Sequence, residues 1–172
     1  QIRPLLFQNQ AGEATAIVEQ DLLAVPSRIL PYQPLGDLII RAPSTGEVSG
    51  YQRSLNLTTG IAVVQYQQGG VQFRREYWSS VPDDVIVVSL FADRANQINL
   101  ELELTRERDA ETLVEASDAA GLRLDGRLMS RYANDATPVP STRFVGRLRA
   151  LPQGGRLYAA GKKLIIEKAT AV

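Results

Sequence analysis

The spacing of apolar residues changes from a helical to an alternating period between residues 30 and 40. Before this point the apolar positions recur at intervals of three and four, as they do on one face of an amphipathic helix. These positions are Ala14, Ile17, Val18 and Leu22, and they follow a shorter apolar segment around Leu5. The pattern therefore predicts two short helices between residues 2 and 24, joined by a turn at 9–12.

The segment 31–40 joins the two patterns and is conformationally constrained. Pro31 and Pro34 each fix φ at about −65° and bias the preceding residue toward an extended backbone. Gly36 permits a backbone geometry that is closed to other residues. We expect this segment to form a stiff entry into a sheet.

After this segment the apolar period is two, which is the period of a β-strand. The pair Gly69-Gly70 separates two alternating runs and predicts a hairpin. Residues 98–104 alternate leucine and isoleucine with Asn99, Glu101 and Glu103, so one face of that strand should be solvated. Residues 85–91 are almost continuously apolar, which is typical of a central strand covered on both faces.

The many short strands at regular spacing predict a mainly β fold, an antiparallel β-sandwich of the super-sandwich type with a short N-terminal helical segment. A chain of 172 residues matches one domain. We expect a helical lead-in at 1–30, sandwich strands at 31–172 and a long loop at 129–142. Because residues 169–172 resemble the approach to another strand, we also expect the chain to be a fragment at both ends.

The composition excludes several classes of function. The 19 basic and 19 acidic residues cancel, so neither a nucleic acid nor an anionic membrane surface is an expected partner. The chain has no Cys and no His, which removes thiolate chemistry and every Ser-His or Cys-His catalytic arrangement. Its apolar runs are far shorter than the ~20 residues that span a bilayer. No motif indicates a cofactor or a metal site, and we expect none.

Acid–base chemistry needs only two carboxylates, so the lack of His does not exclude an enzyme. Asp83 and Asp84 follow Pro82 and are typical of a turn. Asp37 lies in the constrained segment, where its expected role is to accept hydrogen bonds from turn amides. None of these carboxylates has an identifiable catalytic partner in the sequence.

The run from Arg74 to Trp78 combines charged and aromatic residues and has two interpretations. Tyr77 and Trp78 with their polar neighbours make a candidate glycan-binding patch. The alternative is a salt bridge across two strands, with Trp78 packed at the edge of the sandwich.

Four separated segments in this order resemble the N-terminal domain of glycoside hydrolase family 95, the α-L-fucosidase family. They are Ile-Arg-Pro-Leu-Leu-Phe at 2–7, Pro-Tyr-Gln-Pro-Leu-Gly-Asp-Leu at 31–38, Gly-Glu-Val-Ser-Gly-Tyr-Gln-Arg-Ser-Leu-Asn-Leu at 46–57 and Arg-Glu-Tyr-Trp-Ser-Ser-Val-Pro-Asp-Asp-Val-Ile-Val-Val at 75–88. The family more often has Asp at the position of Asn56 and Phe at that of Trp78. Neither departure weakens the resemblance.

The resemblance implies a sandwich that precedes a linker, an (α/α)6 barrel and a C-terminal β domain. In that family the catalytic Glu and Asp lie in the barrel, and the reaction inverts the anomeric centre. Those residues have no counterpart in these 172 positions, so the resemblance implies that this chain contains no catalytic residue. The implied partners are the barrel of the same protein and, through it, a carbohydrate substrate, and the implied location is secreted or periplasmic.

Three hypotheses follow from the resemblance. In the first, the sandwich is non-catalytic and packs on the barrel of a fucosidase-like glycoside hydrolase, with Tyr32, Gln33 and Asp37 facing the barrel or the rim of its pocket. In the second, the sandwich is a carbohydrate-binding module that holds a glycan through Tyr77 and Trp78. In the third, the same domain belongs to an enzyme of other sugar specificity, such as a galactosidase.

Overall fold

The computed structural model describes residues 2–22, 32–43, 46–107, 110–130 and 139–172, which fall into two compact units divided after Pro34. The first unit contains helices α1 (Ile2–Phe7) and α2 (Ala11–Asp21), which pack on each other. A backbone bond from the Gln10 amide to the Leu5 carbonyl closes the turn between them, and Ala14 is buried. Both predicted helices are confirmed, whereas the boundary at 30/31 lies outside the described residues.

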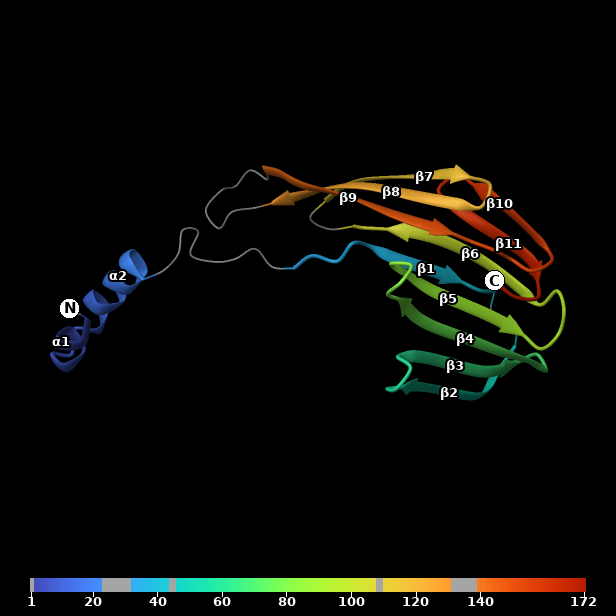
Figure 1. The fold of residues 1–172 in the computed structure, drawn as a ribbon, viewed down its shortest axis with the longest axis horizontal. Helices are drawn as coiled ribbons and strands as arrows, with labels where there is room; N and C mark the ends of the chain where they lie inside the picture. Colours follow the sequence, from blue (N-terminus) through green and yellow to red (C-terminus); the bar gives the residue numbers. More distant parts are fainter. Residues whose placement is uncertain (1, 23–31, 44–45, 108–109, 131–138) are drawn as a thin grey trace. The chain divides into compact units, whose positions relative to one another are not determined.

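The second unit consists of three antiparallel sheets (Figure 1). Sheet A has the order β1-β6-β11-β10, sheet B the order β2-β3-β4-β5, and sheet C the order β7-β8-β9. Their bounds are β1 Asp37–Arg41, β2 Val48–Asn56, β3 Ile61–Gln68, β4 Val71–Ser80, β5 Val85–Ala92, β6 Ile98–Thr105, β7 Ala110–Asp118, β8 Gly121–Ser130, β9 Val139–Arg149, β10 Arg156–Ala160 and β11 Lys163–Ala169. The predicted antiparallel β-sandwich with short N-terminal helices is confirmed.

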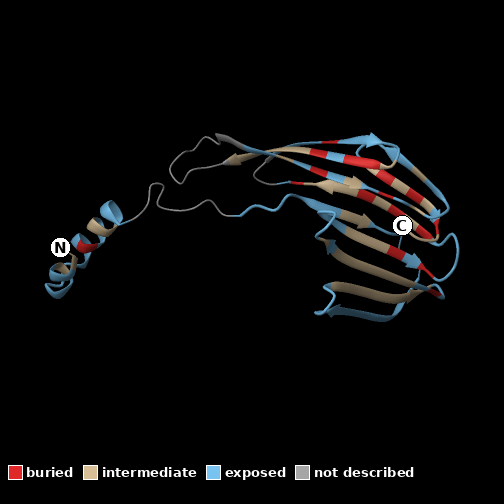
Figure 2. Cartoon of the chain, viewed as in Figure 1, coloured by how far each residue is buried: buried red, intermediate tan, exposed pale blue. Residues whose placement is uncertain are grey.

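One apolar cluster joins the three sheets. Its largest fully buried members, with 0–1% of their surface exposed, are Leu122 of β8 and Leu164 and Ile166 of β11. Leucines and an isoleucine of β6 and the ends of β4 and β5 complete it, and Figure 2 shows the buried positions along these strands. Burial of this apolar surface is the main favourable contribution to the stability of the unit.

β11 links sheet A to sheet B. It pairs with β6 up to Ile166, its register shifts between Ile166 and Ala169, and Lys168 has φ of 55° within this bulge. The Lys168 amide donates to Oδ1 of Asn99 at 3.0 Å, which satisfies a donor that the regular ladder leaves unpaired. Beyond the bulge, the amides of Leu90 and Ala92 in β5 donate to Val172 and Thr170 at 2.9 and 3.2 Å. The same segment therefore extends one sheet and borders another.

The alternation predicted for residues 98–104 is confirmed. The apolar positions of β6 from Ile98 to Leu102 are buried, and the intervening Asn99, Glu101 and Glu103 are only partly covered. The hairpin at Gly69-Gly70 is also confirmed, since β3 and β4 pair directly from Gln68 and Val71 outward. Its two glycines have φ of 59° and 74°, as this type of turn requires.

The prediction that residues 85–91 form a central strand covered on both faces was wrong. β5 is the last strand of sheet B, and the side chains of Ile86 and Phe91 are 82% and 49% exposed. Only the part of β5 near Leu90 and Ala92 packs into the apolar cluster. A continuous apolar run does not distinguish a strand covered along its whole length from one that is covered only at one end.

Glycine at position 36 avoids a steric clash and is not required by an unusual backbone angle. It is not among the residues with positive φ, but a Cβ at this position would lie 2.8 Å from the carbonyl oxygen of Thr105. The chain therefore enters β1 in close contact with the end of β6, with which β1 pairs from Asp37 to Arg41. Of the predicted loop at 129–142, residues 131–138 lie outside the described residues, and the two ends are not loop, because residues 129–130 belong to β8 and residues 139–142 to β9.

Candidate functional site

The residues of the predicted glycan patch leave β4 on opposite faces of sheet B. Tyr77 lies opposite Val88 and Ala62, whereas Trp78 lies opposite Val87 one position along. Because successive side chains of a strand alternate between faces, one bound sugar ring contacts one of these aromatic residues and not both. We call the face of Tyr77 the inner face of sheet B, because Phe73 and Leu90 on it reach the apolar cluster.

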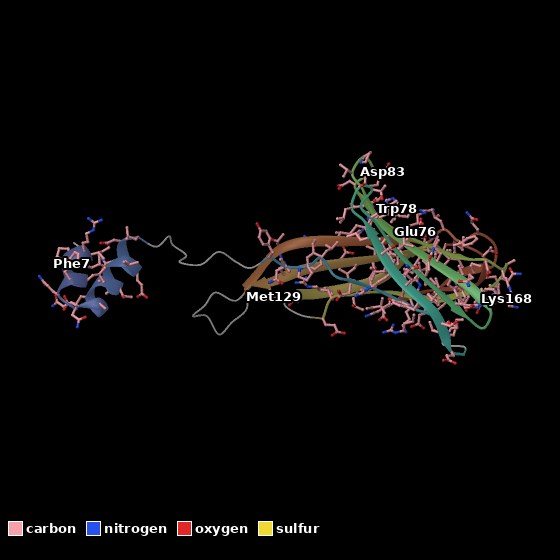
Figure 3. All side chains as sticks on the ribbon, turned by 90° about the horizontal axis from the view of Figure 1, so that it is seen from below. Phe7, Glu76, Trp78, Asp83, Met129 and Lys168 are labelled. Carbon is pink, nitrogen blue, oxygen red and sulfur yellow. The ribbon has the colours of Figure 1, made fainter. Side chains whose placement is uncertain are left out.

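The outer face of sheet B carries Trp78 beside an ion pair. Nε of Arg74 donates to Oε1 of Glu76 at 2.7 Å, and Nη2 of Arg74 contacts the same oxygen. Glu76 and Trp78 both lie toward the β4–β5 turn, where Ser80 donates to Asp83 at 2.5 Å (Figure 3). The ion pair joins two residues of one strand, so the predicted cross-strand bridge was wrong, while the predicted turn at Asp83 and Asp84 is confirmed.

The inner face of sheet B carries a cluster that the sequence analysis did not identify. Tyr66 and Phe73 lie directly opposite each other, with their ring centroids 5.2 Å apart and their planes inclined by 19°. Nη2 of Arg75 donates to the Tyr66 hydroxyl at 3.0 Å. Counting outward from the two-residue turn at Gly69-Gly70 gives the pairing of Tyr66 with Phe73, so the sequence did contain the signal.

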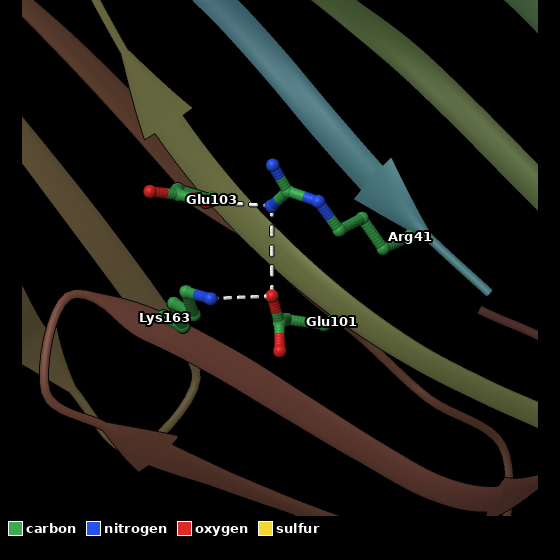
Figure 4. Close-up of polar contacts among 4 residues, drawn as sticks. All are labelled: Arg41, Glu101, Glu103 and Lys163. Atoms are coloured by element: carbon green, nitrogen blue, oxygen red, sulfur yellow. Dashed lines mark hydrogen bonds and ion pairs between the residues drawn. The ribbon is translucent and has the colours of Figure 1, made fainter. Parts of the chain in front are cut away.

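An ion network spans three strands on the outer face of sheet A (Figure 4). Arg41 of β1 lies 2.7 Å from Glu103 and 3.5 Å from Glu101, both of β6. Lys163 of β11 donates to Glu101 at 2.5 Å. The bond from Lys163 is the main reason why the pKa of Glu101 lies below its usual value of 4.5, and the charges of Lys163 and Arg41 act in the same direction against burial.

Glu101 of sheet A and Asp125 of sheet C are paired with basic groups and not poised as proton donors. Arg123 donates twice to Asp125, both at 2.7 Å, and this bonding lowers the pKa of Asp125. A general acid in glycoside hydrolysis needs the opposite, a raised pKa that keeps its proton near neutral pH. Glu101 and Asp125 are thus suited to holding strands together.

The candidate barrel-facing residues are exposed. Tyr32 shows 103% of its reference surface, and Gln33 and Asp37 are exposed as well. Asp37 is the first residue of β1 and pairs with Thr105. Among the described residues, no hydrogen bond to its carboxylate is present, so the expected bonds from turn amides are not observed there.

Asn56 occupies a turn position at which the side chain needs only an oxygen that accepts hydrogen bonds. Its Oδ1 accepts hydrogen bonds from the amides of Thr58 and Thr59 at 2.9 and 3.2 Å. The same residue's carbonyl accepts from Gly60 at 2.8 Å. An amide oxygen performs this turn-closing role as a carboxylate oxygen would, so the β2–β3 turn does not need the charge.

Within the described ranges, no three Asp, Glu, His or Cys side chains gather as they would around a metal ion. In the same part of the chain, no helix has the length and apolar character to cross a membrane.

Comparison with known proteins identifies the family. The sequence pattern of the family described as "Glycosyl hydrolase family 65, N-terminal domain" matches residues 1–172, so the chain belongs to this family of N-terminal domains. The family's description names an N-terminal domain of glycosyl hydrolases.

Two curated relatives are fucosidases. The chain is 31% identical over 110 residues to a protein named "Alpha-L-fucosidase 2" from Arabidopsis thaliana. The aligned region covers 62% of this chain and 13% of that protein. The chain is 32% identical over 89 residues to "Probable alpha-fucosidase A" from Aspergillus niger, covering 52% of this chain and 11% of that protein. These names agree with the resemblance to the α-L-fucosidase family seen in the sequence. The chain thus spans only a small part of the length of these relatives.

The ion network predicts a specific pH dependence. Since the pKa of Glu101 is lowered in the folded state, its contribution to stability is complete above 4.5 and is lost as the pH falls through the lowered pKa. Glu101→Gln should therefore flatten the acid limb of a plot of unfolding free energy against pH, measured by denaturant titration. The exposed Glu111 of β7 provides the control Glu111→Gln, and an equal flattening in both variants would contradict the assignment.

Proposed function

We propose that this chain is the non-catalytic N-terminal sandwich domain of a fucosidase-like glycoside hydrolase. The observation that carries the proposal is the match of all 172 residues to an N-terminal domain family, together with two relatives whose names are those of α-fucosidases. In this proposal the full-length protein hydrolyses α-L-fucosidic bonds with inversion. An (α/α)6 barrel outside these residues supplies the catalytic carboxylates.

The structure of the second unit supports a packing role. Its carboxylates Glu101 and Asp125 are engaged with basic groups whose bonds lower their pKa values. Large apolar side chains such as Leu55, Leu57 and Ile86 are more than half exposed on sheet B and the adjoining β2–β3 turn. Exposed apolar surface of this kind is suited to contact with another domain.

A first prediction concerns catalysis. The 172-residue chain alone should not hydrolyse aryl α-L-fucosides, because the acid and the base lie elsewhere, whereas the full-length protein should. Release of the aryl group measures both. Turnover by the purified chain would contradict the proposal. Hydrolysis of aryl α-galactosides but not of fucosides by the full-length protein would establish the other specificity, with the domain's role unchanged.

We also propose that Tyr32, Gln33 and Asp37 face the barrel. Their exposure supports this, and the Asp37 carboxylate offers a charged acceptor for donors of another domain. Asp37→Ala should lower the unfolding free energy of the full-length protein by about 1.5–3 kcal/mol, the size of a hydrogen bond to a charged group. Thermal or denaturant unfolding measures the change.

The matched control for Asp37→Ala is the same substitution in the isolated chain. There it should change stability little, because no described group donates a hydrogen bond to the carboxylate. Lost turnover of the full-length variant at unchanged stability would instead place Asp37 at the sugar pocket.

A second candidate function is glycan binding by the sandwich itself, favoured by the aromatic side chains of sheet B. Trp78 on the outer face and Tyr77 on the inner face define two separate surfaces for it. The inner face is the better candidate for a binding site, because Tyr66, Phe73 and Arg75 on this face border a cavity.

A further inference from the structure

A cavity of about 250 Å³ lies beside the inner face of sheet B. One wall is formed by Tyr66, Phe73 and Arg75, and the opposite side by Pro43, which follows β1, and by Asn99 and Leu100 of β6. Pockets for drug-sized ligands measure about 300–1,000 Å³, so this cavity suits a single monosaccharide unit rather than an oligosaccharide.

Two stacked aromatic rings form part of the wall. Tyr66 and Phe73 lie face to face across the β3–β4 hairpin, and both line the cavity. Because the two rings cover one face of each other and the Arg75 guanidinium lies over Tyr66, a sugar would meet the aromatic carbons that remain open to the cavity. Contact between the apolar C–H groups of a pyranose ring and aromatic carbon is favourable.

Arg75 brings a positive charge to the same wall. Its guanidinium carbon lies 5.5 Å from the centre of the Tyr66 ring, and its hydrogen bond to the Tyr66 hydroxyl uses one of five N–H donors. Burial opposes this charge, but the phenol groups of Tyr66 and Tyr77 outweigh burial and raise the pKa of Arg75 above its usual value. Arg75 is therefore cationic at every physiological pH.

No acidic residue shares the inner face of sheet B. The strand registers place Arg53 and Arg75 on this face, while Glu76 is on the outer face with Arg74. The remaining side chains that face inward in β3, β4 and β5 are apolar, aromatic, amide or hydroxyl groups. The face is consequently positive, and the planar carboxylate of an acidic sugar matches the fork of a guanidinium with two parallel hydrogen bonds.

We propose that this cavity binds a sugar unit that carries a carboxylate, a hexuronic acid. The sugar ring packs against the aromatic carbons of Tyr66 and Phe73 that line the cavity, and its carboxylate receives two hydrogen bonds from Arg75. The amide side chains of Gln97 and Asn99, which also line the cavity, bond to the ring hydroxyls. The inference rests on the second candidate function, glycan binding by the sandwich, and is independent of the bond that the full-length protein cleaves.

The test is calorimetric titration of the full-length protein with methyl glucuronide and methyl galacturonide, compared with the neutral methyl glucoside and methyl galactoside. Saturable binding of at least one uronide is expected, about tenfold or more tighter than its neutral counterpart, because only the uronide pairs with Arg75. Arg75→Gln should remove this preference while leaving turnover of aryl fucosides unchanged. Arg75→Lys keeps the charge without the fork and should retain only part of the preference.

Two controls locate the site. Arg53→Gln removes the same charge from the same face outside the cavity lining, and Trp78→Ala alters the outer face, so both should leave uronide affinity within about twofold. Absence of saturable uronide binding would overturn the proposal, as would equal affinity for neutral sugars or unchanged affinity in a folded Arg75→Gln protein. Loss of binding in Trp78→Ala alone would keep glycan binding by the sandwich but place it on the outer face. Inactivity of the full-length protein on fucosides with intact uronide binding would refute the fucosidase proposal alone.

Discussion

The passage of the chain from β11 of sheet A to residues 170–172, which bond to β5 of sheet B, is the constraint on which the rest of the sandwich depends. Leu164 and Ile166 of β11 are fully buried against β6, and the bulge at Lys168 then turns the chain so that residues 170–172 pair with β5. Bulges commonly let a strand change direction or leave a sheet without losing its hydrogen bonds. Sheet B is therefore attached to the core by backbone bonds as well as by apolar contacts.

This attachment explains the unequal faces of sheet B. The end that holds Val71, Phe73 and Leu90 lies in the apolar cluster, whereas the end toward Ile86 and Leu55 is exposed. The cavity beside Arg75 lies at the first of these ends, where Val71, Phe73 and Leu90 line it. Packing against another domain and binding of a sugar unit thus use different parts of one sheet, and a rigid core is required for both.

Much of this architecture was predictable from local pattern, and the rest depended on long-range pairing. The alternation of β6 and the turn at Gly69-Gly70 identified strands because each is a local signal. The exposure of β5 and the steric role of Gly36 could not be predicted, because both depend on segments distant in sequence, residues 170–172 and Thr105. At the candidate site, Tyr77 and Trp78 were identified by residue type, but the cavity at Arg75 needed the register of β3 and β4 and the approach of β6.

Whether β11 holds all three sheets in one cooperative unit is tested most directly by amide hydrogen exchange in wild-type and Leu164→Ala protein. Removing this buried side chain should cost about 2–5 kcal/mol. If it does, the amides of β8 and those of Leu90 and Ala92 in β5 lose protection by the same free energy as those of β11. Wild-type protection in β5 and β8, with loss confined to β6 and β11, would contradict it.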